Sequence, residues 1–276
     1  FADHSRICIG MYESVAKVEN GGDAFVEAFA DAFESEDVDI LCRTEVEECL
    51  DVKDKRVGGF RLSDGREVTF ESAVFAIHPH LMLQTLPPDK ISNGFIHRLS
   101  DFEPSSGFFA VFGLFGTLYD TTANIISIYP SDDVNRMVHA TEREEDSAIV
   151  LIRSREVLNG KPVHAVTALE VSEYANIAAW AETHTGRRPQ EYLQYKARKT
   201  TRMCERVNAM VGHKFGDLKP FTSSSMLTFR DYLNSPDGSA YGIRQQVGQI
   251  KCIGRLPLRN LFAAGQSALQ PGVVGA

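Results

Sequence analysis

The chain has 276 residues, of which 43% are hydrophobic and 24% charged, the balance of an ordinary globular protein. Its formal net charge of -8 argues against nucleic acid as a partner, because binding phosphates needs a basic face. No apolar run approaches the roughly 20 residues of a membrane-spanning helix. The sequence therefore predicts a globular protein with one large domain or two of moderate size.

The five cysteines are scattered along the chain and form no C-x-x-C pair. An odd, dispersed set is typical of reduced thiols in the cytoplasm. We therefore expect a cytoplasmic protein with neither a disulfide framework nor a zinc or other metal site. The cysteines are Cys8, Cys42, Cys49, Cys204 and Cys252.

The first ninety residues combine one helix with several short strands. After Gly21-Gly22, apolar residues recur with helical spacing as far as Phe33, which predicts an amphipathic helix. Asp64-Gly65 indicates a hairpin turn within an antiparallel meander. The expected strands span residues 38–42, 45–52, 57–62 and 67–70.

A further apolar strand, residues 73–77, is expected to be buried and runs directly into His78-Pro79-His80. Two histidines around a proline are compatible with a metal site or an acid–base role. We interpret them instead as residues that cap the strand end and open a helix.

Long strands dominate the region that begins near residue 91. Pro189 precedes an expected long helix, residues 190–211, and a proline at this point costs no hydrogen bond. We interpret the basic side chains of this helix, Lys196, Arg198, Lys199, Arg202 and Arg206, as a solvated face. The expected strands span residues 107–116, 124–129, 147–153, 163–171 and 220–229.

Five phenylalanines gather just before and within the first of these long strands. Aromatic strand residues usually fill a core, but they also line pockets for apolar ligands, and both interpretations stay open. The residues are Phe102, Phe108, Phe109, Phe112 and Phe115.

The C-terminal end, residues 260–276, has the pattern of a strand, a turn and a helix start. The apolar run 261–264 predicts a short buried strand that stops at Gly265. A second break follows at Pro271-Gly272, before small residues that suit a helix start. Such a junction directs backbone N–H groups and the positive end of a helix dipole at whatever lies above it.

This order of elements predicts an α/β (α+β) fold with a divided domain. Residues 1–90 and 256–276 are expected to form one body, and residues 91–255 a second, strand-rich body. No internal repeat of 20–50 residues is apparent.

Several of these segments, taken in order, resemble FAD-dependent oxidoreductases of the phytoene desaturase, carotenoid isomerase and retinol saturase group, within the flavin amine oxidase superfamily. The two most specific segments are residues 237–242 (Asp-Gly-Ser-Ala-Tyr-Gly) and the stretch 265–275. The resemblance implies a Rossmann-like FAD domain built from discontinuous segments, 1–90 and 256–276. It also implies a mixed-sheet substrate-binding domain with helices, 91–255.

The resemblance also implies the cofactor contacts. Val46 would lie beside the adenine, and Gly265 and Gln266 near the pyrophosphate and ribityl chain. Four further residues would lie at the pyrimidine edge of the flavin: Pro271, Gly272, Val273 and Val274. N–H donors there would stabilise the negative charge of reduced flavin.

The sequence departs from the family pattern at two points. Gln266 stands where many relatives in the wider superfamily carry an acidic residue, although an amide can still donate to ribityl or phosphate oxygens. The G-x-G-x-x-G fingerprint that holds the pyrophosphate is not found between a strand and a helix. We therefore expect this chain to begin after that segment and, on its own, to bind FAD weakly or not at all and to be inactive.

Three hypotheses about function follow. The first is an FAD-dependent oxidoreductase that desaturates, saturates or isomerises an apolar polyene-type substrate. The second is an amine oxidase or an orphan flavoprotein of the same superfamily, and the third a non-catalytic binding domain on the same scaffold. The sequence assigns no catalytic acid or base, and peripheral membrane contact stays open.

Overall fold

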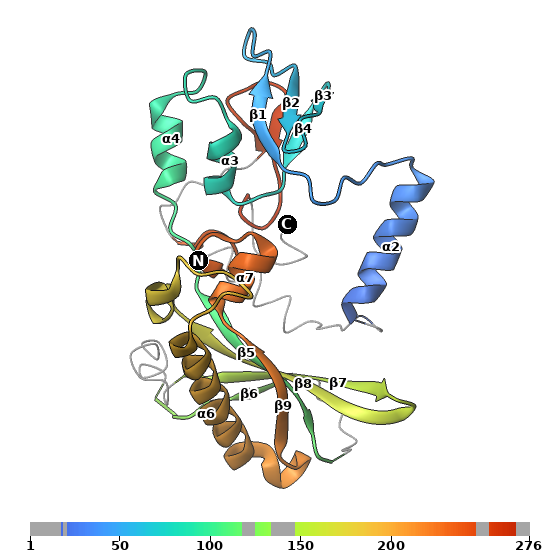
Figure 1. Ribbon diagram of the computed structural model, residues 1–276, viewed down its shortest axis with the longest axis vertical. Helices are drawn as coiled ribbons and strands as arrows, with labels where there is room; N and C mark the ends of the chain where they lie inside the picture. The colour runs from blue at the N-terminus through green and yellow to red at the C-terminus, as the bar shows by residue number, and fades with distance from the viewer. Residues whose placement is uncertain (1–17, 19–20, 118–124, 134–146, 247–253, 269–276) are drawn as a thin grey trace. The chain divides into compact units, whose positions relative to one another are not determined.

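The structure is a computed structural model that describes residues 18, 21–117, 125–133, 147–246 and 254–268. Its helices and strands form an α/β (α+β) fold, as predicted (Figure 1). The chain divides into two compact units, each with its own hydrogen-bonded sheets. Unit 1 comprises Phe1–Ser100 and Gln246–Ala276, and unit 2 comprises Asp101–Gln245.

Unit 1 contains the predicted helix and the predicted meander. Helix α2 spans Gly21–Ser35, and none of its residues is buried. Strands β1 (Val46–Leu50), β2 (Gly59–Leu62) and β3 (Glu67–Thr69) pair antiparallel in the order β1-β2-β3. The Asp64-Gly65 hairpin is confirmed, because the Gly65 N–H donates to the Leu62 carbonyl at 2.9 Å and so closes the β2–β3 turn.

The strand predicted over residues 38–42 does not form. Asp37 and Arg43 have φ angles of 55° and 56°, so the chain bends into the left-handed region on either side of this segment. Its apolar side chains Val38, Ile40 and Leu41 are exposed. Apolar composition alone was misleading here, since a strand also needs a partner for its backbone groups.

The second sheet of unit 1 joins chain segments that are far apart in the sequence. Strand β11 (Leu261–Ala263) pairs parallel with β4 (Ala73–Phe75) and antiparallel with β10 (Gly254–Arg255). The buried Leu261 confirms the predicted C-terminal strand. The expectation of a buried strand at 73–77 holds only in part, because β4 is the last strand in the order β10-β11-β4 and Val74 is 62% exposed.

Asn260 fixes the start of β11 through its buried side-chain amide. Its Oδ1 accepts the Val57 N–H at 2.9 Å, and its Nδ2 donates to the carbonyls of Val57 at 2.9 Å and Glu71 at 3.2 Å. The Asn260 carbonyl in turn accepts the Ala73 N–H at 2.9 Å. One side chain thus ties the C-terminal strand to the chain on both sides of the β2–β3 hairpin.

Two short helices follow β4. Helix α3 spans Pro79–Thr85 and helix α4 spans Asn93–Ser100. Leu99 on α4 and Met82 on α3 are almost fully buried. The Thr85 hydroxyl donates to the Val46 carbonyl at 3.2 Å and joins the end of α3 to the start of β1.

Unit 2 is built on a five-stranded sheet with the order β6-β7-β8-β5-β9. Every pairing is antiparallel, where a mixed sheet was expected. Only two residues separate β7 from β8, a length that suits an antiparallel hairpin and not a parallel crossover. The strands are β5 (Gly107–Phe115), β6 (Ile125–Ile128), β7 (Ile149–Leu158), β8 (Lys161–Ser172) and β9 (Leu218–Ser224).

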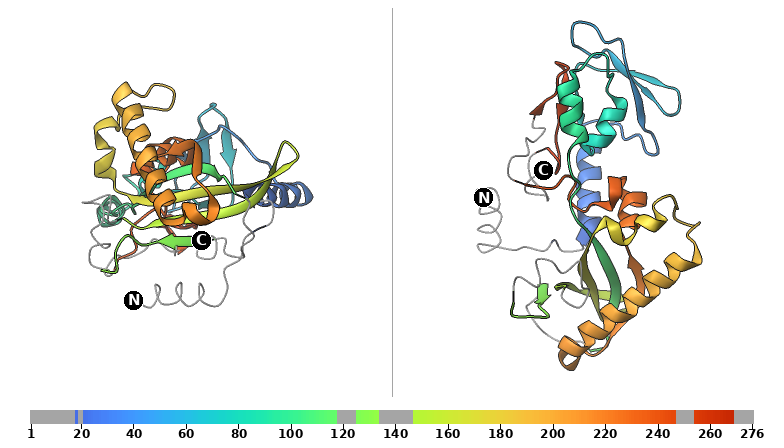
Figure 2. Two further views of the ribbon diagram at one scale, coloured as in Figure 1. Left: turned by 90° about the horizontal axis from the view of Figure 1, so that it is seen from below. Right: turned by 90° about the vertical axis from the view of Figure 1, so that its left-hand side faces the viewer.

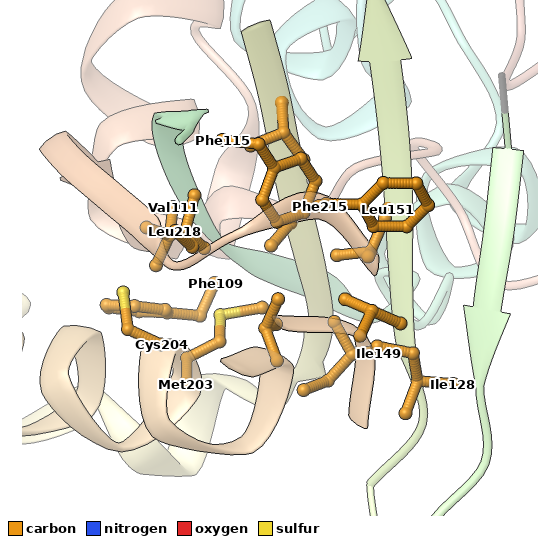
Figure 3. Packing of buried hydrophobic residues seen from close by; sticks show 14 residues of the cluster. Phe109, Val111, Phe115, Ile128, Ile149, Leu151, Met203, Cys204, Phe215 and Leu218 are labelled. Carbon is orange, nitrogen blue, oxygen red and sulfur yellow. The ribbon is translucent and has the colours of Figure 1, made fainter. Parts of the chain in front are cut away.

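Helix α6 (Gln190–Phe215) runs along one face of this sheet, as Figures 1 and 2 show. It begins after Pro189, as predicted, and extends four residues beyond the expected end at Val211 because Phe215 and Val211 are buried against the strands. Figure 3 shows the core between the two layers, to which the sheet contributes Phe109 and Leu151 and the helix contributes Met203. Burial of this apolar layer stabilises the fold of unit 2.

The basic side chains of α6 are only partly solvated. Lys199 is buried, and its Nζ lies 3.9 Å from the Glu170 carboxylate of β8. Arg206 lies 3.5 Å from the other oxygen of Glu170. Arg198 and Arg202 are exposed, as predicted for a solvated face. The prediction is wrong for Lys199, whose charge can be buried because the carboxylate of Glu170 lies beside it.

The strand predicted over residues 220–229 ends at Ser224, and helix α7 (Met226–Leu233) follows at once. Ser225 caps this helix: its Oγ accepts the Leu227 N–H, and the Thr228 hydroxyl accepts the Ser225 N–H. Capping-box geometry of this kind stops the strand and starts a helix. Short 3-10 turns complete the unit: η3 (Tyr174–Asn176), η4 (Ala178–Trp180) and η5 (Pro236–Gly238).

Candidate functional site

The candidate site in unit 1 is the carboxyl edge of the parallel pair β4 and β11. In parallel sheets, ligands bind outside the carboxyl ends of the strands. The Ala264 N–H donates to the Phe75 carbonyl at 2.9 Å, so both strands end side by side. The chain then turns through residues 264–268, which we call the Gly265 turn.

The Gly265 turn requires glycine because of its backbone angle. Gly265 has a φ of 90°, a conformation that side chains strongly disfavour, and a Cβ placed there would lie 3.8 Å from Ala76. The Ala268 N–H donates to the Gly265 carbonyl at 2.9 Å and closes the turn. Within the part of the chain that the structure describes, the N–H groups of Gly265 and Gln266 donate no hydrogen bond.

The predicted FAD contacts fall into three groups. Gly265 and Gln266 lie together on the turn, and both are partly buried. Val46 lies at the start of β1, where its carbonyl accepts a hydrogen bond from the Thr85 hydroxyl. Thr85 is the last residue of α3, and His78 caps the opposite end of this helix. The other four, Pro271, Gly272, Val273 and Val274, lie outside the described residues. The role of each of these residues stays a prediction.

His78 is the third residue after β4 and follows its carboxyl end. It is the N-cap of α3, and its Nδ1 accepts the His80 N–H at 3.2 Å, as the capping interpretation predicted. The two imidazole rings meet edge to face, with 4.8 Å between their centroids. Burial, assisted by the neighbouring His80, lowers the pKa of His78 to about 4, so its ring is neutral at pH 7.

Unit 2 offers a different surface, the face of its sheet opposite α6. Opposed residues of an antiparallel pair share a face, so Phe112, Thr167, Ile152 and Ile125 form one row across four strands. Ile125 and Ile152 are exposed. We call this surface the open sheet face, with these residues: Phe108, Phe112, Leu114, Ile125, Val150, Ile152, Thr167, Leu169 and Val171.

The register separates the five phenylalanines that the sequence grouped. Phe109 and Phe115 are core residues on the α6 side, and Phe102 is also buried. Phe108 and Phe112 point to the open sheet face and are only half-buried. The core interpretation is therefore correct for the first three, and a ligand-lining role remains for Phe108 and Phe112.

Sequence reasoning missed a buried ionic network in unit 2. Asp231 on α7 accepts the Thr185 N–H and hydroxyl at 2.8 and 2.7 Å. Arg188 lies 2.5 Å and Arg230 2.7 Å from the same carboxylate. Local sequence patterns can indicate only the adjacent Arg230 as a partner of Asp231. Thr185 and Arg188 lie more than forty residues away in the chain.

Two kinds of site are absent from the described ranges. No group of three or more His, Cys, Asp and Glu side chains there is arranged to hold a metal ion. No helix among these residues is long and apolar enough to cross a bilayer. Cys42, Cys49 and Cys204 are free thiols, while Cys8 and Cys252 lie outside the described residues.

Neither a known protein family nor a curated protein matches the sequence. Among solved structures, the chain is similar to an oxidoreductase from Methanosarcina mazei, with a TM-score of 0.57 and 12% identity over 93% of this chain and 52% of the other. A protein from Pyrococcus furiosus has a TM-score of 0.48 and 11% identity, over 92% of this chain and 48% of the other. Cyclohexylamine oxidase from Brevibacterium oxydans has a TM-score of 0.47 and 15% identity, over 90% of this chain and 48% of the other.

These likenesses concern the fold alone. The chain spans about half the length of each of these structures. Of these three, the Methanosarcina mazei oxidoreductase alone gives a TM-score above 0.5, and at 12% identity it shows a shared fold and no more.

Proposed function

We propose that the chain is part of an FAD-dependent oxidoreductase whose dinucleotide binds at the carboxyl edge of β4 and β11. The observation that carries this proposal is the Gly265 turn, a glycine turn directly after a parallel strand with two N–H groups that donate to no described residue. The fold shared with the Methanosarcina mazei oxidoreductase and the family resemblance of residues 265–275 support it.

The residues at this edge fit a dinucleotide in size and charge. The turn consists of Ala264, Gly265, Gln266, Ser267 and Ala268, so no large side chain blocks the backbone and no carboxylate repels a phosphate. Backbone N–H groups at such a turn form an anion-binding concavity. Bound FAD would supply the redox chemistry, and these residues would bind and orient it.

We further propose that the open sheet face of unit 2 contacts an apolar substrate of the polyene type. Apolar side chains on the face that α6 leaves uncovered favour an extended, apolar ligand. Phe108 and Phe112 would contribute flat aromatic contacts there. The polyene itself rests on the family resemblance, and no described residue is assigned as a catalytic acid or base.

The flavin content of the protein produced from its complete gene tests the proposal. We expect the purified protein to show a flavin absorbance spectrum, or to acquire one after incubation with FAD and removal of the excess. Replacing Gly265 with valine should reduce the bound flavin at least tenfold, because a β-branched residue does not adopt a φ of 90°. A matched control is Gly65→Val, since Gly65 has a φ of 85° in the β2–β3 hairpin, away from the proposed site.

The two variants separate a local effect from a general loss of folding. Both should cost stability through backbone strain, but only Gly265→Val should release flavin. A colourless protein that cannot be reconstituted with FAD would contradict the proposal. Equal flavin retention in the two variants would place the dinucleotide elsewhere.

A further inference from the structure

The hydrogen bond at the start of α3 determines the tautomer of His78. Its Nδ1 accepts the backbone N–H of His80 at 3.2 Å, so this nitrogen carries a lone pair rather than a proton. A neutral imidazole has one N–H, which in His78 must therefore be Nε2–H. The side chain presents a fixed, uncharged donor on the side of the ring opposite the helix cap.

Among the described residues, this donor has no acceptor. His78 is only 8% exposed, and its Nε2 is buried without a hydrogen-bond partner. The Nε2 of His80, whose ring packs against that of His78, is also buried and unpartnered. Buried polar atoms in folded proteins are nearly always hydrogen-bonded, so two such atoms in contacting rings indicate a group that binds there.

The position of His78 connects this donor to the Gly265 turn. A Cβ at Gly265 would contact Ala76, the first residue after β4. His78 is two residues further on, and two extended residues span at most about 7 Å. Neither residues 76–80 nor the turn contains a carboxylate, so the groups on offer are donors for an oxygen-rich anion.

We propose that His78 binds the dinucleotide by donating its Nε2–H to a phosphate oxygen, alongside the N–H groups of the Gly265 turn. This inference rests on the proposed function and adds a residue that the sequence comparison did not indicate. His78 is a binding residue with two roles: one ring nitrogen caps α3, and the other holds the ligand.

The variant His78→Asn separates these two roles. The asparagine Oδ1 is attached to Cγ as the histidine Nδ1 is, so it can accept the His80 N–H, and asparagine is a preferred N-cap. The Nε2–H donor is lost. We expect the unliganded variant to fold and to unfold at a temperature close to that of the wild type, because the cap is kept and the buried Nε2–H is exchanged for the shorter amide group of asparagine.

The affinity of this variant for the dinucleotide, by contrast, should fall. Titration calorimetry with the complete gene product should show FAD affinity reduced about tenfold or more, the loss expected for a hydrogen bond to a charged acceptor. ADP-ribose, which carries the pyrophosphate without the flavin ring, should lose affinity by the same factor. The control His97→Asn, exposed on α4 in the same unit, should leave both affinities unchanged.

Each outcome decides the proposal. A change of less than twofold for FAD, or a loss for FAD but not for ADP-ribose, would overturn the phosphate contact and leave the proposed function standing. No FAD binding by the wild type would overturn both. If His78→Asn fails to fold, the wild-type protein provides a second test. The Nε2–H signal of the His78 imidazole should shift in ¹⁵N-resolved NMR when FAD is added. An unchanged signal would contradict the proposal.

Discussion

Replacing Asp231 with alanine is expected to lower the free energy of unfolding by about 3–5 kcal/mol. The substitution leaves the Arg188 guanidinium, whose side chain is 8% exposed, without its carboxylate. Two donors of Thr185 and one arginine of α7 lose their acceptor as well. Removing one partner of a buried ion pair costs more than the pair contributes, because the remaining charge stays desolvated.

Trp180 reports this change directly. It is the single tryptophan of the chain, and its ring lies 5.6 Å from Tyr192 and 5.1 Å from Tyr195, in the segment that the Asp231 network holds. Urea unfolding followed by its fluorescence should shift strongly for Asp231→Ala. The control Glu103→Ala removes an ion pair to Arg244 in which both side chains are about half exposed, and its effect should stay below about 1 kcal/mol.

The same carboxylate makes stability depend on acid. Burial alone would raise the pKa of Asp231, but hydrogen bonds from Thr185 and Arg230 and the charge of Arg188 outweigh it and lower the pKa to about 2. An unfolded aspartate has a pKa of about 3.9. The depressed pKa in the folded state therefore stabilises the fold fully above about pH 4, and this contribution of roughly 2–3 kcal/mol is lost as the pH falls toward 2.

This pH dependence should be absent from Asp231→Asn. The difference in unfolding free energy between wild type and this variant is expected to shrink between pH 5 and pH 2. A constant difference over that range would show that the carboxylate charge contributes nothing.

Replacing Asn260 with alanine is expected to cost about 3 kcal/mol. The change leaves the N–H and carbonyl of the buried Val57 without the partners that Asn260 supplies. The Glu71 carbonyl loses one of its two donors and keeps the hydrogen bond from Arg56. The start of β11 then loses its only side-chain tie, among the described residues, to the meander. Asn260→Asp should lower the free energy of unfolding by a similar amount. It keeps the acceptor for the Val57 N–H but turns a carboxylate oxygen toward the carbonyls of Val57 and Glu71.

Hydrogen exchange measures this effect where it occurs. Amides of β4 and β11 should exchange faster in Asn260→Ala than in the wild type. Asn93→Ala offers a control, since Asn93 is exposed at the start of α4 and a surface change of this kind is usually worth less than about 0.5 kcal/mol. Unchanged exchange at residues 261–263 would mean that β11 does not depend on Asn260.

The sequence predicted the elements whose signals are local. The Asp64-Gly65 hairpin, the His78 cap and the helix after Pro189 each follow from neighbouring residues, and each was confirmed. The helix α7 was missed, although Ser225 and Thr228 have capping-box spacing, because β-propensity dominated the interpretation of that segment.

Long-range features were out of reach of local patterns. The burial of Lys199 depends on Glu170, which lies on another strand. The buried hydrogen bonds of Asn260 depend on Val57, which lies 203 positions earlier in the chain. For the candidate site, the sequence indicated Gly265 and Gln266, but the proximity of His78 emerged only when β4 and β11 were paired.

Hydrogen–deuterium exchange of the complete gene product with and without FAD tests the location of the site most directly. The N–H groups of Gly265 and Gln266 donate to no described residue, so they should exchange fast without ligand and become strongly protected when FAD binds. Peptides spanning the β7–β8 turn at Asn159-Gly160 in unit 2 should not change. Protection elsewhere with unaltered exchange across residues 264–268 would contradict the account.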